Sequence, residues 1–283
     1  MSTNKKQKGD FNPLLRIFVY AVLAIFTFLT IYPLFWLVMS SFKTTNEFLR
    51  NPMGWPIEPT LNNYPTAWVR AQFSTLFTNS LFFTIVSTLA VIFLSLMAGF
   101  GFAKIKSKAT PLLHGSFIIG ILLTIESVMI PLFLFINLIG LYNTRTGVLI
   151  PYIGMGLPMG IYLCTEFIRS IPDSVVESAR IDGASYARIF LSIVVPMAKP
   201  VAVTLAILNV AGVWNEFMLV NMLVSSDALR TLPVGILKFS GPLSSRYGLQ
   251  FASLTIGMIP IVIFYLFFRK EITKGVSAGA VKG

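Results

Sequence analysis

Long apolar runs alternate with short polar segments along this chain, and six of the runs are long enough to form a membrane-spanning helix. They cover residues 14–41, 76–103, 112–136, 147–168, 201–223 and 249–268. A helix needs about 20 mostly apolar residues to cross a hydrocarbon layer of roughly 30 Å. The pattern therefore predicts an all-α membrane protein with six transmembrane helices. They form one domain at residues 14–270, between tails at residues 1–13 and 271–283.

The segments between and within these runs suggest further features. Residues 43–75 carry several prolines among aromatic and polar side chains, which predicts an ordered cap without regular elements. Residues 224–248 are rich in glycine and predict either a loop that reaches a partner or substrate, or a plain connector. The fourth run is interrupted by Pro151, Gly154, Gly156, Pro158 and Gly160, which indicates either a hinge or close helix packing.

Composition and charge support the membrane assignment and give an orientation. Hydrophobic residues make up 55% of the chain and charged residues only 12%, which is typical of a membrane protein and not of a soluble one. The side that holds both termini carries 15 of the 22 lysines and arginines, and the other side carries 7. Because cytoplasmic loops are enriched in these residues, both termini are expected in the cytoplasm. The net charge of +11 then reflects topology, and no nucleic-acid partner is expected.

The polar segment at residues 169–199, between the fourth and fifth runs, predicts two short helices joined by a turn. Pro172 is acceptable in a first helical turn, so the first helix is expected to begin there. Glu177 and Arg180 are three residues apart and can pair on the helix surface. Gly183 allows a tight turn, and a second helix is expected over residues 184–195, before Pro196 returns the chain to the membrane.

The spacing in this segment resembles the cytoplasmic motif of permease subunits of bacterial ATP-binding-cassette importers. In that motif Glu-Ala-Ala is followed after three residues by Gly, and nine residues later by Ile-x-Leu-Pro. This chain has Glu177-Ser178-Ala179, then Gly183, then Ile193-Val194-Val195-Pro196. Ser178 and Val195 depart from the pattern, but both replacements are small or apolar.

Other stretches resemble the carbohydrate-uptake branch of these permeases, the maltose-transporter type. They are Asn79-Ser80-Leu81, Trp214-Asn215-Glu216-Phe217, Thr231-Leu232-Pro233-Val234-Gly235 and Gly279-Ala280-Val281-Lys282-Gly283. The resemblance covers nearly the whole chain. It implies a type I importer permease fold in a bacterial cytoplasmic membrane, acting as an inner-membrane component of binding-protein-dependent transport.

The resemblance also implies partners and a coupling site. The partners are a second related permease, two ATP-binding-cassette ATPase subunits and an extracytoplasmic substrate-binding protein, and the solute is a sugar. The 169–199 loop would form a coupling helix docked on an ATPase. The residues implied in ATPase coupling are Glu177, Ala179, Arg180, Asp182, Gly183, Ile193 and Pro196.

The chain itself is expected to be neither an enzyme nor a cofactor-binding protein. It lacks the Gly-x-x-x-x-Gly-Lys-Ser/Thr loop that holds nucleotide phosphates. ATP and Mg would therefore be bound by the partner ATPase subunits. The single cysteine, Cys164, excludes disulfides within the chain and cysteine-rich metal sites, and we expect no metal site.

Polar side chains within the apolar runs are the candidate substrate pathway. Glu126 lies midway along the third run, where a charged group normally faces the bundle interior or a watery cavity. Asn209 and Glu216 share a helical face of the fifth run with Gly212, next to Trp214 and Asn215. Amides, carboxylates and aromatic rings are the groups that bind sugars.

Three interpretations of these polar groups stay open at this point. They could line a pathway, pair with neighbouring helices for structure, or carry ions. The last would fit a gradient-driven secondary transporter that uses Glu126 and Glu216, although the chain shows no evident inverted repeat. Within the importer class, another solute such as glycerol phosphate is the alternative to an oligosaccharide.

Overall fold

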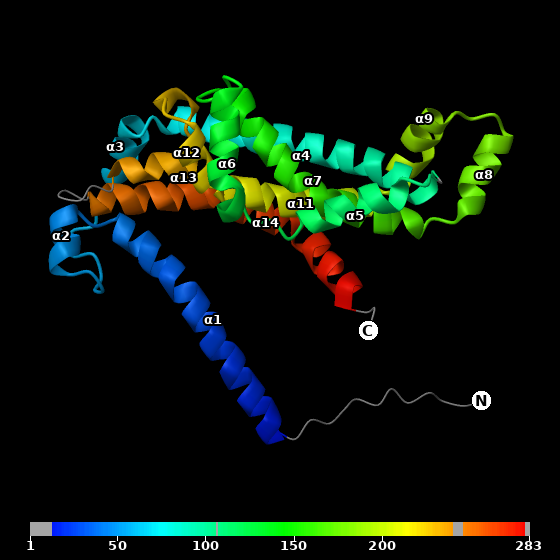
Figure 1. The fold of residues 1–283 in the computed structure, drawn as a ribbon. Coiled ribbons are helices and arrows are strands. Elements are labelled where there is room, and N and C mark those ends of the chain that lie inside the picture. The colour runs from blue at the N-terminus through cyan, green and yellow to red at the C-terminus, as the bar shows by residue number, and fades with distance from the viewer. Residues whose placement is uncertain (1–12, 106, 240–245, 281–283) are drawn as a thin grey trace. The chain divides into compact units, whose positions relative to one another are not determined.

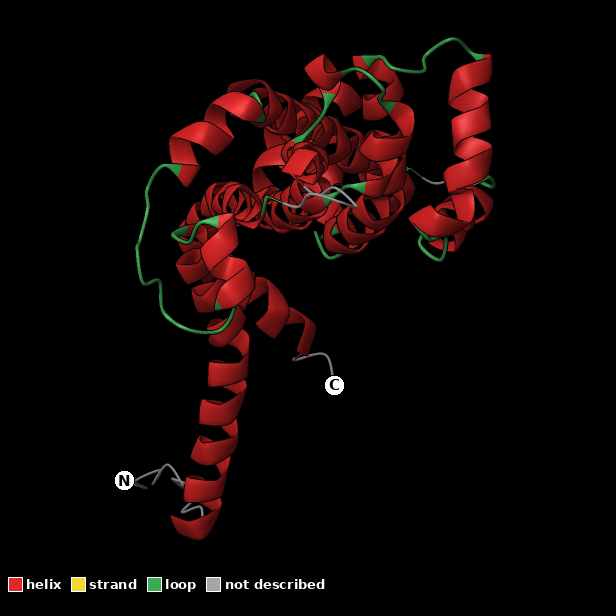
Figure 2. Cartoon of the chain, turned by 90° about the vertical axis from the view of Figure 1, so that its left-hand side faces the viewer, coloured by secondary structure: helices red, strands yellow, loops and turns green. Residues whose placement is uncertain are grey.

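The structure is a computed structural model that describes residues 13–105, 107–239 and 246–280. Helices and connecting loops make up this part of the chain, which contains no strand (Figures 1 and 2). Most of the N-terminal tail lies outside the described residues. So do the last three residues, 281–283, which end the C-terminal stretch that resembles the carbohydrate branch. The chain divides into two compact units, Met1–Ala67 with Phe239–Thr255, and Trp68–Lys238 with Ile256–Gly283.

The first unit contains α1 (Pro13–Ser41) and α2 (Thr45–Arg50). Both α3 (Asn63–Arg70) and α14 (Tyr247–Ala280) have residues in each unit. The remaining α-helices and a π-helical turn belong to the second unit. They are α4 (Phe73–Lys104), α5 (Thr110–Gly120), α6 (Ile125–Leu138), α7 (Arg145–Arg169), α8 (Asp173–Ile181), α9 (Tyr186–Ile189), a π-helical turn (Phe190–Val194), α10 (Val195–Met197), α11 (Lys199–Asn215), α12 (Met218–Leu223) and α13 (Leu232–Ile236).

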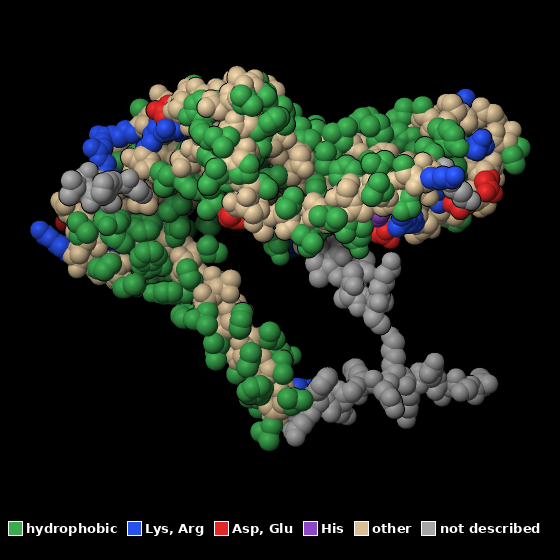
Figure 3. Space-filling view, in the orientation of Figure 1, with side chains coloured by type: hydrophobic (Ala, Val, Ile, Leu, Met, Phe, Trp, Pro, Cys, Tyr) green, Lys and Arg blue, Asp and Glu red, His purple; other side chains and the backbone are tan. Residues whose placement is uncertain are grey.

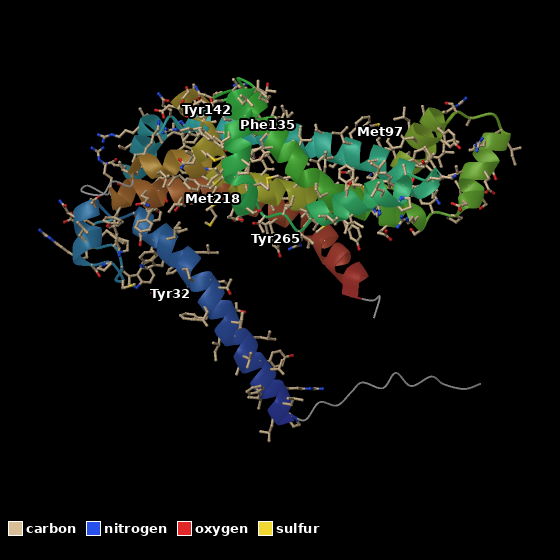
Figure 4. All side chains as sticks on the ribbon, in the orientation of Figure 1. Tyr32, Met97, Phe135, Tyr142, Met218 and Tyr265 are labelled. Atoms are coloured by element: carbon tan, nitrogen blue, oxygen red, sulfur yellow. The ribbon has the colours of Figure 1, made fainter. Side chains whose placement is uncertain are left out.

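Among the described residues, four single helices are long and apolar enough to cross a membrane: α1, α4, α7 and the Tyr247–Lys270 part of α14. The number rises to six if each of two bent helix pairs counts as one span, which agrees with the predicted architecture. The chain is therefore a multi-pass all-α membrane protein. Apolar side chains cover much of its surface, including those of Met97, Phe135 and Met218 (Figure 4).

Two of the predicted runs are wrong as continuous helices. The third run breaks between α5 and α6, whose axes differ by 103°. In the fifth run, helix α11 ends at Asn215 and α12 begins at Met218. Just before this run, a 73° bend separates α11 from the Tyr186–Met197 segment. Apolar composition sets the depth at which a segment is stable but does not fix its direction, so neither bend was visible in the hydropathy pattern.

Helix α7, by contrast, is continuous although it contains Pro151 and Pro158. Gly156 and Gly160 lie against neighbouring helices, unlike Gly154, which faces open space: a Cβ on Gly156 would come 2.7 Å from Val91 of α4 and 2.8 Å from Asn209 of α11. A Cβ on Gly160 would overlap Ser95 of α4. Small residues let membrane helices approach closely, and the structure therefore assigns these glycines to packing.

The predicted cap is also more regular than expected, because α2 and α3 form within residues 43–75. In the first unit, Lys43 is fully buried and its Nζ donates to three carbonyl oxygens, of Asn51 at 2.9 Å, Pro52 at 3.4 Å and Gly54 at 2.5 Å. Each carbonyl belongs to the irregular segment after α2. The ammonium thus holds that segment in place where no helix does.

We expect Lys43→Met to loosen this segment, because the Asn51 and Gly54 carbonyls lose their donor and the Pro52 carbonyl keeps only Trp36 Nε1. The loss is roughly 2 kcal/mol. Limited chymotrypsin digestion of the protein in proteoliposomes should show faster cleavage within residues 44–62. A separate thermal unfolding measurement should show a lower midpoint. Arg50→Met removes an exposed cation from the same segment and serves as the control. Equal cleavage of the two variants would contradict the role of Lys43.

Candidate functional site

The first helix and the turn of the 169–199 loop form as the sequence predicts. Helix α8 begins after Pro172, with Asp173 in its first turn, where a carboxylate favours the helix dipole. Gly183 follows α8 with φ of +80°, a left-handed conformation that favours glycine. The Ala184 amide donates to the Ala179 carbonyl at 3.0 Å and closes the turn. The second helix differs from the prediction, since it divides into α9, the π-helical turn and α10.

Apolar side chains attach this loop to the ends of α4 and α7. Val176 of α8 and Ile189 of α9 are buried in one cluster with Phe100 of α4 and Ile168 of α7. The Phe190 ring lies 5.8 Å from that of Phe100. Figure 1 shows α8 and α9 at the end of the second unit where α4 ends and α5 lies, away from α6 and α12. Charged side chains gather at this end on the face shown in Figure 3.

Most of the predicted coupling residues are accessible. Glu177, Arg180, Asp182, Gly183 and Pro196 are exposed, whereas Ala179 and Ile193 are partly buried against the core. Within the described residues, Glu177 and Arg180 form no ion pair, contrary to the expectation. The Arg180 guanidinium instead lies 5.0 Å above the Tyr186 ring and joins α8 to α9 by a cation–π contact. Ile181, at the end of α8, is 86% exposed.

Lys104 is a residue of this site that the sequence did not single out. Its Nζ donates to the Ile171 carbonyl oxygen at 2.5 Å and to Asp173 Oδ1 at 2.6 Å. Sequence reasoning counted Lys104 only as one of the charges that orient the chain. The carboxylate acceptor lies 69 positions later, and nothing in the local pattern of either residue indicates this pairing.

Two of the predicted pathway residues make structural contacts instead of facing open space. Asn209 Nδ2 of α11 donates to Thr88 Oγ1 of α4 at 2.8 Å. Glu216 lies in the break between α11 and α12, where its carboxylate accepts from the Leu219 amide at 2.6 Å and from the Tyr152 hydroxyl at 2.8 Å. Glu216 therefore caps α12 and ties it to α7.

The other pathway candidates are divided between the core and the surface. Trp214 is 7% exposed and packs edge-on against Phe77, with ring centroids 6.0 Å apart. Asn215 is exposed, and its Nδ2 donates back to the Ala211 carbonyl. Glu126 is exposed in the first turn of α6, beside the bend, and not midway along a buried helix. The structure thus brings Trp214, Asn215 and Glu216 to one helix end and leaves Glu126 on a separate element.

Two of the stretches that resemble the carbohydrate branch meet in the structure. Asn79 Nδ2 of α4 donates to the carbonyls of Ala228 at 2.8 Å and Arg230 at 3.0 Å, and Ser80 Oγ accepts from the Leu232 amide at 2.9 Å. Gly235 packs so closely on Leu76 that a Cβ would overlap it. The segment after α12 is therefore anchored on α4 rather than loose.

Asp227 gives the same segment a charged cluster. Lys238 Nζ donates to Asp227 Oδ2 at 2.9 Å, and Arg230 lies 2.9 Å from the other oxygen. The hydrogen bond from Lys238 and the charges of both cations hold the pKa of the Asp227 carboxyl below its ordinary value. The carboxylate therefore stays ionised, and the pairs persist, at neutral and mildly acidic pH.

A multi-pass helical domain with an exposed two-helix loop at one end places the chain among integral membrane proteins. Residues 92–277 match the family model described as the binding-protein-dependent transport system inner membrane component. The chain belongs to this family.

Individual relatives agree over almost the full length. The chain is 34% identical to the multiple sugar-binding transport system permease protein of Streptococcus mutans, covering 93% of this chain and 96% of that protein. It is 33% identical to the probable starch degradation products transport system permease protein of Thermoanaerobacterium thermosulfurigenes, with 91% and 94% covered. Among solved structures, a chain of a bacterial ABC transporter involved in the import of the acidic polysaccharide alginate has the same fold. It matches with a TM-score of 0.79 at 22% identity, and the match covers 92% and 98% of the two chains.

We expect Glu216→Ala to destabilise the protein by about 2 kcal/mol, because the Tyr152 hydroxyl and the α12 amides lose a charged acceptor. Tyr152→Phe should cost less, and the double variant should be less destabilised than the sum of the two single changes. Thermal unfolding of the detergent-purified protein measures all three. Strict additivity would show that the two side chains do not interact.

Proposed function

We propose that this chain is the translocation-pathway subunit of an ATP-driven importer for a sugar, most simply an oligosaccharide. The exposed 169–199 loop carries the proposal. It is a short two-helix element, fixed by apolar packing at its base and open to solvent along α8. Such an element can transmit movement between an ATPase and the membrane helices if both bias its position.

In this proposal the loop docks on one of two ATPase subunits, which bind ATP and Mg, and the chain pairs with a second, related permease. Both termini and the loop face the cytoplasm. An extracytoplasmic binding protein delivers the solute to the opposite side. The sugar-transport and polysaccharide-import names of the relatives and of the solved structure support a saccharide as the solute.

Co-expression with the neighbouring genes tests the assembly. The detergent-purified complex is analysed by mass spectrometry for the identity and ratio of its subunits. One related permease and two ATPase copies per chain would support the importer. A stable chain alone, or a homo-oligomer without ATPase, would contradict it and favour a gradient-driven transporter.

If the 169–199 loop docks on an ATPase, substitutions at its tip, the end of α8 at Ile181, should weaken ATPase binding. Ile181→Asp should weaken ATPase binding about tenfold or more, because an exposed apolar side chain at a docked tip behaves as an interface anchor. Glu177→Lys should disconnect ATP hydrolysis from transport by reversing a charge on α8. Co-elution of the ATPase and its hydrolysis rate measure both effects. Ile181→Leu is the matched control, and unchanged co-elution of Ile181→Asp would refute docking at this tip.

Contact with the solute predicts a different outcome for the exposed pathway candidates. Glu126→Ala and Asn215→Ala should each lower uptake about threefold to tenfold, as expected for one lost hydrogen bond to a sugar hydroxyl. Their unfolding midpoints should stay unchanged, unlike that of Glu216→Ala. Uptake is measured in proteoliposomes. The sugar used is the one that raises the unfolding temperature of the binding protein encoded by a neighbouring gene. Unchanged uptake in both variants would remove these side chains from the pathway.

A further inference from the structure

Lys104 joins a transmembrane helix directly to the first helix of the 169–199 loop. It is the last residue of α4, and its side chain is only 3% exposed. Its two acceptors are the Ile171 carbonyl, just after α7, and the carboxylate of Asp173, the first residue of α8. One ammonium group therefore lies where α4, the end of α7 and the start of α8 come together.

The chemistry of this contact makes it directional and costly to break. A cation is favoured at the C-terminal end of α4 and an anion at the N-terminal end of α8, so both helix dipoles support the pair. The Lys104 ammonium is buried, so separating it from its acceptors would leave an unpaired charge away from water, which is costly. Asp173 is 68% exposed, so the pair loses little by remaining at the surface on that side.

Only a few apolar side chains of α8 pack against the membrane helices. Val176 is the one buried residue of α8, and Val175 and Ala179 pack partly against the core. The apolar packing of Val176 allows sliding, whereas the hydrogen bonds of Lys104 fix the start of α8 in both position and direction. Movement of α8 would thus pull on the end of α4.

We propose that Lys104 is a positioning residue that transmits movement of α8 to α4 through Asp173 and the Ile171 carbonyl. This inference rests on the proposed function, since the movement originates in the ATPase subunits. It extends that function by naming the route into the membrane domain. Through α4 the route reaches Thr88, which binds Asn209 of α11, so a shift of α4 also moves the helix beside the candidate pathway.

The test follows α4 itself in the assembled complex. A spin label is placed on α4 at Met97→Cys, whose side chain position is 48% exposed, with the partner subunits in cysteine-free form. Cys164 is the only native cysteine and is buried, so the introduced cysteine is the one that reacts. The change in the label's spectrum on trapping with ATP, Mg and vanadate reports transmission without any need for the transported solute.

We expect Lys104→Met to reduce this spectral change about fivefold or more, within the range of coupling between sites in proteins. The ATPase should still co-elute, because the tip of α8 is unaltered. Lys104→Arg, which keeps a donor cation, should restore most of the response. Lys108→Met is the matched control, since it removes an exposed lysine from the same connecting segment and alters the topological charge equally.

Asp173→Asn provides a milder variant if Lys104→Met fails to assemble. It removes the charged acceptor, leaves the Ile171 carbonyl in place, and should give an intermediate loss of the response. A full response in Lys104→Met, or equal losses in Lys104→Met and Lys108→Met, would overturn the proposal for Lys104 alone. Absence of the ATPase, or of any response in the unsubstituted complex, would overturn the proposed function together with it.

Discussion

The close approach of α4 and α7 is the constraint on which the rest of the second unit depends. Gly156 and Gly160 of α7 face α4, and Gly99 of α4 faces Cys164 of α7, with no room for a Cβ at any of the three. Within a bilayer there is no hydrophobic force between helices, so tight packing of small residues is a main source of attraction. The pair fixes where α4 ends, and that end determines where the 169–199 loop can attach.

Several polar residues in the second unit hold irregular backbone. Glu216 accepts from amides at the break before α12, and Asn79 donates to carbonyls of the segment after it. Non-helical backbone at membrane depth is stable only when its polar groups find partners within the protein. Groups committed in this way are not available to a solute unless the structure changes, which leaves Glu126 and Asn215 as the accessible polar candidates.

The sequence predicted the class of fold, the membrane character and the start of the first helix in the 169–199 loop, because each depends on local signals. Apolar run length identifies spans, and Pro172 and Gly183 mark a helix start and a turn. The sequence did not predict the bend between α5 and α6, the division of the helix after Gly183, or the contacts of Lys104. The partners of Lys104 and Asn79, and the hydroxyl that binds Glu216, are 64 or more positions away in the chain. Only the packed helices bring them together.

The two kinds of attachment at the 169–199 loop differ in what they can transmit. Apolar contacts such as those of Phe190 are non-directional, and they keep the loop at the bundle end while allowing α8 to tilt. Hydrogen bonds from Lys104 depend on angle and distance, so a tilt of α8 must either stretch them or carry α4 along. Since α4 also packs closely on α7, a pull on its end is shared between the two helices instead of being absorbed locally. In the proposed mechanism, the end of α4, and not the apolar cluster, is therefore the point through which a movement of α8 enters the membrane domain.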